Sequence, residues 1–292
     1  MRYDVTLRIT YEYDEPVTSG RQILRLMPAD LPREQQVLSG SLSIRPLPED
    51  RRMGQDFWGN ATVSVVHRSP QTRLEYEVRA RVERLAPAGA PGDPVALDAL
   101  PDAIETHRSL GSDSPHHFRG PSPRVPAVPE IAAYARGLVA AGMTVADAVE
   151  AVGTSLHRDM TFDPEATKVD TPVEEAFGRR HGVCQDFTHV MIAGLRDVGV
   201  PAAYVSGYLR TIPPEGRPRL EGADAMHAWV RAWYGPARGW MEYDPTNAMP
   251  VHRAHIVVAR GRDYGDIAPI RGVLRTSGTQ KTKQAVDVVP LT

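Results

Sequence analysis

Residues 181–190, HGVCQDFTHV, contain the only cysteine in a chain of 292 residues and stand where an amphipathic stretch begins. After Cys184, apolar side chains recur at spacings of three and four as far as Val198, which predicts a helix with one buried face. Gly199 ends this helix, and residues 201–209 read as a strand. Unpaired N–H groups and the helix dipole favour a thiolate at a helix amino terminus. The stretch therefore predicts a reactive cysteine.

A second stretch, HAWVRAWYGPARGWMEYDPTN (227–247), reads as two aromatic-rich strands around a Gly-Pro turn. The midpoint of positions 227 and 244 falls inside that turn, so a symmetric hairpin places His227 directly opposite Asp244. A carboxylate in this place can hold one nitrogen of the imidazole and leave the other for a thiol. A slip of one residue in the turn would move the carboxylate off this axis.

Each of these residues also has a purely structural interpretation. A lone cysteine is more often a small buried hydrophobic residue than a nucleophile, but the helix start and the His–Asp pair favour a catalytic Cys184. His227 alone could be a core histidine, and Asp244 alone could begin the Asp-Pro-Thr-Asn turn through an Asx hydrogen bond. Asp244 can do both jobs. Asp186 is expected to stabilise the helix start.

The first part of the chain has a β pattern. Apolar and polar residues alternate over 3–11 and again over 74–82, which predicts strands with one exposed face. The sequence DFWGN (56–60) supplies a turn, and shorter candidate strands lie near 23–27, 37–44 and 62–67. Strands separated by turns, without a helical period, favour an antiparallel β-sandwich or barrel domain over residues 1–85.

The pattern changes after this β domain. Residues 86–127 are predicted to be a linker and connecting segment, because LAPAGAPGDP (85–94) and the proline-rich stretch 111–129 are typical of loops. Helical patterns follow, and one of them opens with a threonine and an aspartate in capping-box spacing. These predicted helices cover 129–142, 144–157 and 171–177. Residues 128–292 are therefore assigned to a second domain, of α+β class.

Composition excludes several classes of protein. The hydrophobic share of 41% and the charged share of 24% are typical of a soluble globular chain. With 34 basic and 36 acidic residues, the sequence lacks the basic surplus of a nucleic-acid-binding protein. One cysteine excludes a disulfide framework, no run approaches the ~20 apolar residues of a membrane span, and no signal peptide is visible. We expect a cytoplasmic protein that binds neither nucleic acid nor membrane, and its oligomeric state is left open.

Four motifs in the order GVCQDF, GVPAAYVSGYL, HAW and GWMEYDPTN resemble the core of the bacterial transglutaminase-like superfamily. The β-rich start with DFWGN resembles the N-terminal domain that such proteins usually carry, and HIVVARGRDYGDIAPIRGV (255–273) resembles their usual ending. The resemblance implies a papain-like α+β core with a Cys–His–Asp triad. At the matching positions, it implies that Cys184 is the nucleophile, His227 the base and Asp244 the residue that orients the base.

The same resemblance implies acyl transfer at an amide or peptide bond of a peptide or protein, through a thioester and without cofactor or metal. With water as acceptor the enzyme is a cysteine protease or amidase, which is our expectation. With an amine it is a protein-glutamine transglutaminase, and a catalytically silent binding module is the alternative from another class. The Cys184 N–H is the expected first oxyanion donor. The second is backbone, another type of side chain, or Trp58 or Gln71 from the first domain.

Overall fold

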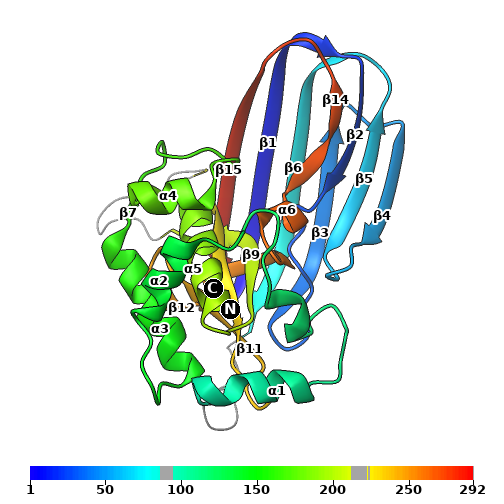
Figure 1. The fold of residues 1–292 in the computed structure, drawn as a ribbon. Helices are drawn as coiled ribbons and strands as arrows, with labels where there is room; N and C mark the ends of the chain where they lie inside the picture. Colours follow the sequence, from blue (N-terminus) through cyan, green and yellow to red (C-terminus); the bar gives the residue numbers. More distant parts are fainter. Residues whose placement is uncertain (86–94, 212–221, 223, 292) are drawn as a thin grey trace, which may run out of the picture.

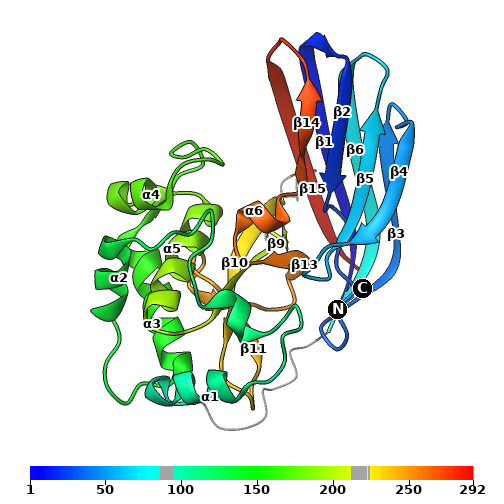
Figure 2. The ribbon, with the colours of Figure 1, turned by 45° about the vertical axis from the view of Figure 1, so that its right-hand side comes forward.

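The computed structural model describes residues 1–85, 95–211, 222 and 224–291. The fold is α+β and has three parts, which Figures 1 and 2 show from two sides. Helices form one outer layer, a five-stranded antiparallel sheet lies in the middle, and a β-sandwich covers the other side. We call the helices and the middle sheet the core domain. Within the described ranges, no helix is both long enough and apolar enough to cross a membrane.

The sandwich consists of two separate four-stranded antiparallel sheets and does not close into a barrel. Along β1, the side chains of Tyr3, Val5 and Leu7 are buried and the intervening ones are more exposed, as the alternation in the sequence predicts. One sheet has the strand order β15-β1-β6-β3 and the other β14-β2-β5-β4. The strands are β1 (Arg2–Val17), β2 (Ser19–Leu24), β3 (Gln35–Arg45), β4 (Asp50–Gln55), β5 (Ala61–His67), β6 (Gln71–Arg84), β14 (Ile270–Arg275) and β15 (Gln280–Leu291).

Strands β14 and β15 come from the part of the chain that the sequence analysis assigned to the second domain. In the structure, β15 pairs with β1 along its whole length, and Arg2 lies opposite Leu291. β14 pairs with β2 in the other sheet. The chain therefore leaves the sandwich after β6, builds the core domain, and returns to complete both sheets (Figure 1).

The core domain is built on a sheet with the strand order β12-β11-β10-β9-β13. Its strands are β9 (Ala202–Leu209), β10 (Ala225–Trp233), β11 (Trp240–Asp244), β12 (Met249–Pro250) and β13 (His255–Gly261). The helices are α1 (Leu100–Thr106), α2 (Pro129–Arg136), α3 (Val145–Asp159), α4 (Val173–Arg179), α5 (Cys184–Asp197) and α6 (Tyr264–Ile267), with 3-10 turns η1 (Leu97–Ala99) and η2 (Pro115–Phe118). The short strands β7 (Thr161–Phe162) and β8 (His181–Gly182) pair with each other beside the start of α5.

Helix α5 is the centre of the core domain. It begins at Cys184 and ends at Asp197, as the sequence predicts, and the strand after it is β9. The helix packs on β9 and β10 and against α2, α3 and α4. Because it is covered on both sides, polar residues such as Thr188 and His189 are buried with the apolar ones. More of the helix is buried than the single face that the sequence predicts, because the spacing of apolar residues identifies only the more apolar side.

The other predicted helices are present with small differences. Thr144 and Asp147 form the predicted capping box at the start of α3, with the Asp147 N–H donating to Thr144 Oγ1 at 3.2 Å. Helix α2 ends at Arg136, earlier than predicted, and the chain then forms a loop. Of the predicted linker, residues 86–94 lie outside the described residues. Helix α1 lies in the rest of it and buries two apolar side chains, Leu100 and Ile104.

Two side-chain amides join the sandwich to the core sheet. Gln35 donates from Nε2 to the carbonyl oxygen of Val257 at 2.8 Å and accepts the Val257 N–H at 2.9 Å. Asn60, in the predicted 56–60 turn, forms the same pair of bonds with the backbone of Arg260, both at 2.8 Å. Each amide thus bonds one backbone N–H and one backbone carbonyl of the edge strand β13. These bonds fix the position of the sandwich relative to the core sheet.

Candidate active site

Cys184 is the first residue of α5 and is partly exposed. The turn before it is held by Asp186, whose buried carboxylate accepts the Val183 N–H at 2.8 Å and the Thr167 hydroxyl at 2.6 Å. Burial raises the pKa of Asp186, against the effect of these two donors. A Cβ atom on Gly182 would lie 2.6 Å from Asp186 Oδ2, so only glycine allows this close approach. Asp186 therefore stabilises the helix start, as expected from the sequence.

His227 and Asp244 lie on adjacent strands, but the register differs from the predicted one. Trp233 pairs with Trp240, and the turn spans residues 235–239, with a glycine of positive φ at each end. Asp244 is therefore diagonal to His227 and not directly opposite it. The longer turn shifts the register by two residues, and an even shift keeps both side chains on the same face. His227 Nε2 lies 2.7 Å from Asp244 Oδ2.

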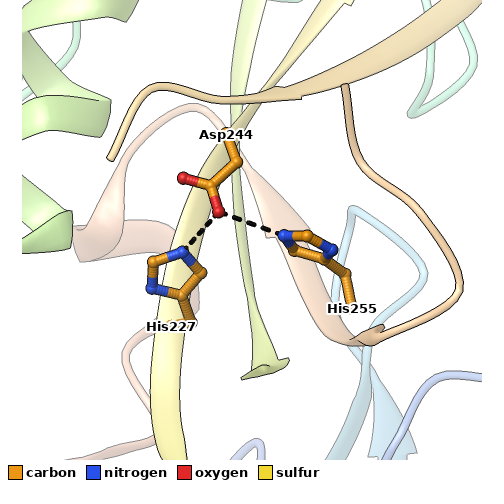
Figure 3. Close-up of side chains that lie close together, drawn as sticks. All are labelled: His227, Asp244 and His255. Carbon is orange, nitrogen blue, oxygen red and sulfur yellow. Dashed lines mark hydrogen bonds and ion pairs between the residues drawn. The ribbon is translucent and has the colours of Figure 1, made fainter. Parts of the chain in front are cut away.

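The Asp244 side chain is fully buried, and its two oxygens have separate partners. Oδ1 accepts the backbone N–H groups of Thr246 and Asn247 at 3.0 and 3.2 Å, which is the Asx turn that the sequence suggests. Oδ2 faces His227 Nε2 at 2.7 Å, His255 Nε2 at 3.0 Å and the side-chain amide of Asn247 at 2.7 Å. Figure 3 shows the two imidazoles converging on this single oxygen.

These contacts set the charges in the site. Burial alone would raise the pKa of Asp244, but the hydrogen bonds from His227, His255 and Asn247 hold it far below its usual range. Burial alone would lower the pKa of His227, but the hydrogen bonds to Asp244 and to the Cys184 thiol raise it well above its usual range. Because Nε2 faces Asp244, the imidazole reaches the thiol through Nδ1. The arrangement favours an imidazolium between a carboxylate and a thiol.

Cys184 and His227 line a cleft of about 250 Å³. One wall belongs to the sandwich, which contributes Ile9 and Tyr11 from β1, Ile270 from β14 and Gln284 from β15. Among the described residues of this cleft, no aspartate, glutamate, lysine or arginine is present. The remaining lining residues are Val169, Val183, Gln185, Tyr204, Ser206, Met226, Ala228, Tyr264 and Pro269.

The structure separates Cys184 from both side chains that were considered as second oxyanion donors. Trp58 lines a different cavity and packs on Phe118, with ring centroids 5.1 Å apart. Gln71 begins β6 and lies outside the residues that line the cleft. The wall of the cleft instead holds Tyr204, whose pKa is raised well above the usual value by burial and then by the nearby thiol. Its hydroxyl therefore stays protonated as a hydrogen-bond donor.

The sequence analysis missed two residues of the site, His255 and Tyr204. Tyr204 stands among small residues in β9, and that pattern indicates a buried strand without showing what the phenol faces. His255 opens the apolar run of β13, and its approach to Asp244 depends on the order of strands in the sheet. The one available signal was that residues 255–273 belong to the stretch with a family resemblance.

Two imidazoles and a carboxylate are also a donor set for metal ions. Ligand atoms of His227, Asp244 and His255 all lie within 4.8 Å of one another. Both ring nitrogens, however, lie at hydrogen-bonding distance from the same oxygen, 2.7 and 3.0 Å. The cluster therefore has the geometry of a carboxylate that accepts two N–H bonds.

Two family models match the chain: "Bacterial transglutaminase-like N-terminal region" over residues 3–83 and "Transglutaminase-like superfamily" over residues 132–245. An uncharacterized protein of Mycobacterium tuberculosis is 32% identical over 99% of this chain and 93% of its own length. The chain belongs to the transglutaminase-like superfamily. The matched core segment contains Cys184, His227 and Asp244, and members of this superfamily are usually enzymes.

Further comparisons find similar chains in two other bacteria. An uncharacterized protein of Mycobacterium leprae is 29% identical over 96% of each chain. Among solved structures, a protein of Cytophaga hutchinsonii described as a candidate cysteine protease aligns with a TM-score of 0.75 and 20% identity. The alignment covers 100% of this chain and 92% of that one, so the two proteins share the fold of both domains.

Proposed function

We propose that the protein is a thiol-dependent acyl-transfer enzyme, a cysteine protease or amidase that acts on peptide or protein amides. The observation that supports this most strongly is the chain of contacts at the site. Cys184 stands at the start of α5, His227 is within hydrogen-bonding reach of its thiol, and the buried Asp244 holds the far nitrogen of His227. The arrangement supplies a nucleophile, a base and a group that orients the base.

In the proposed reaction, the Cys184 thiolate attacks the carbonyl carbon of the amide and forms a C–S bond. The oxyanion that develops is stabilised by the Cys184 N–H and by the Tyr204 hydroxyl. His227 gives its Nδ1 proton to the leaving amine as the C–N bond breaks. The neutral imidazole then takes a proton from water, which attacks the thioester and releases the acid and the thiolate. His227 is again an imidazolium at the end of the cycle.

The cleft suggests which substrates are accepted. Apart from Cys184 and His227, its described lining is uncharged, so a charged substrate side chain bound away from these two residues would lose its hydration without gaining a partner of opposite charge. At about 250 Å³, it is smaller than the roughly 300–1,000 Å³ of pockets that hold drug-sized ligands. We propose that it holds one uncharged side chain next to the reacting carbonyl, and that the sandwich acts as a wall of the substrate site.

Trapping of the acyl-enzyme tests the proposed function. The protein is incubated with a peptide library, quenched in acid and digested, and the fragment with Cys184 is weighed by mass spectrometry. We expect acyl groups on Cys184 from peptides with uncharged side chains at the reacting residue, and none from their aspartate or lysine counterparts. An acyl group that leaves only after a primary amine is added would indicate a transglutaminase. No acylation by any peptide, together with slow modification of Cys184 by iodoacetamide at mildly acidic pH, would indicate a silent binding module.

We expect the activity to be independent of metal ions. Treatment with EDTA should leave turnover unchanged, while iodoacetamide should remove it, because a thiolate supplies the nucleophile. The control is addition of Zn²⁺ after chelation, with turnover measured at each step. Loss of activity on chelation and its recovery with Zn²⁺ would contradict the thiol mechanism and would assign the group His227, Asp244 and His255 to a metal.

A further inference from the structure

His255 contacts the same oxygen of Asp244 as His227 does. It is the first residue of β13, its side chain is fully buried, and its Nε2 atom lies 3.0 Å from Asp244 Oδ2. Figure 3 shows the two imidazoles side by side, each with a nitrogen pointing at the same carboxylate oxygen. His255 therefore contacts the residue that orients the base and is absent from the cleft that holds Cys184.

The surroundings of His255 define which of its ring nitrogens carries the proton. The backbone N–H of His252 points at Nδ1 from 3.5 Å, so Nδ1 acts as an acceptor. In a neutral imidazole the other nitrogen is then the donor, and Nε2–H points at Asp244. A second proton on Nδ1 would face the His252 N–H. His255 is thus held as a neutral donor, and the positive charge of the cluster belongs to His227.

The ring of His255 is also held in place by packing. The Trp229 ring lies against it edge to face, with centroids 5.2 Å apart, and the His252 ring does the same at 4.8 Å. Trp229 can occupy this position because residue 207 is glycine: a Cβ atom there would lie 2.4 Å from the indole. The donor therefore has a fixed direction and does not need to be ordered when substrate binds.

We propose that His255 is a positioning residue for the reaction at Cys184, an inference that rests on the proposed function. Its neutral Nε2–H holds Asp244 Oδ2 in line with His227. The other carboxylate oxygen accepts the two backbone N–H groups of the Asx turn, so the turn and His255 hold the planar carboxylate by its two different oxygens. Without His255, the buried Oδ2 loses one of its three donors, and the carboxylate that faces the His227 imidazolium is held less firmly.

Two substitutions of similar chemistry distinguish a hydrogen bond from His255 to Asp244 from a role of His255 in packing alone. His255→Gln places an amide N–H about where Nε2 was, so the bond to Asp244 can form. His255→Asn is one methylene shorter: its amide oxygen can still accept the His252 N–H, but its N–H cannot reach Asp244. Both are compared with the wild type for kcat, for KM, and for the pH dependence of iodoacetamide alkylation at Cys184. Thermal melting reports whether each variant is folded.

We expect His255→Asn to lower kcat about 10-fold, the order of one hydrogen bond to a charged group, with KM changed by less than about twofold. The midpoint of its alkylation profile should move to higher pH. His255→Gln should stay within about threefold of the wild type in kcat. Equal losses in both folded variants, or no loss in either, would overturn the positioning role.

A further comparison covers the case in which His255→Asn folds poorly. His255→Leu, which removes the N–H donor but keeps a buried side chain, should move the alkylation midpoint to higher pH by itself and should not move it further in an Asp244→Asn background, because the group through which His255 acts is gone. An added effect there would indicate a role independent of Asp244. The two proposals fail in different ways. If the wild type is never acylated, the proposed function is wrong. The role of His255 is still decided by comparing the alkylation profiles of the wild type and the variants.

Discussion

Replacement of Cys184 by alanine should reduce kcat/KM by several orders of magnitude, to the background of the assay. The loss is expected to be this large because the thiolate forms the covalent intermediate, and removal of a nucleophile leaves only binding and oxyanion stabilisation. The fold should be nearly unaffected, since Cys184 is partly exposed and contributes one small side chain at the edge of the core. We expect the melting temperature to change by less than about 3 °C.

Cys184→Ser is the matched variant, because it keeps the size of the side chain and replaces the thiol by a weak nucleophile. It should be inactive and as stable as Cys184→Ala, with activity and thermal melting measured on the same preparations. The prediction is falsified if Cys184→Ala unfolds the protein while Cys184→Ser remains active, since the thiol would then be a packing residue.

Asp244→Asn should lower kcat at least ~10-fold, a loss of 1.4 kcal/mol of transition-state stabilisation, with a much smaller effect on KM. An amide has one accepting atom, whereas both carboxylate oxygens of Asp244 accept. Its NH₂ group must face either the backbone N–H groups of Thr246 and Asn247 or the Nε2 atoms of His227 and His255. The imidazolium also loses its counter-charge, so the alkylation profile of Cys184 should move to higher pH in the free enzyme.

The control for this substitution is Asp263→Asn. Asp263 is equally buried and caps α6 by accepting the Gly265 N–H at 2.7 Å, but it makes no hydrogen bond to His227. The Asp263→Asn substitution should lower the melting temperature without moving the alkylation profile of Cys184. Steady-state kinetics and alkylation at a series of pH values are measured for both variants. Unchanged results for Asp244→Asn would remove Asp244 from the mechanism and leave it as a turn residue.

Local patterns in the sequence were enough to predict the start of α5 and the pairing of His227 with Asp244. The first depends on helix periodicity and the second on hairpin symmetry, and both involve residues close together in the chain. The register was off by two residues because the turn is longer than the Gly-Pro dipeptide. The prediction that His227 and Asp244 share a face is still correct, because strand side chains alternate with a period of two and the register differs by an even number.

The parts that were not predicted depend on contacts between distant residues. The sequence analysis did not identify residues 280–291 as a strand, and no local pattern there selects β1 as a partner. His255 on β13 reaches Asp244 on β11 although β10 and β9 lie between these two strands in the sheet. The wall of the cleft at Ile9 and Gln284 has the same origin. Sheet order is a property of the whole fold, and no short window of sequence contains it.

The return of β14 and β15 to the sandwich links the folding of the two domains. Residues 270–291 are synthesised after the whole core domain, yet they provide one strand to each sheet of the sandwich. Until they emerge from the ribosome, β1 lacks one of its two partners, and closing the contact between residues 2 and 291 spans almost the entire chain. Both domains should therefore unfold in one cooperative transition. In the nascent chain, the cleft around Cys184 gains Ile270 and Gln284 only after β14 and β15 have docked.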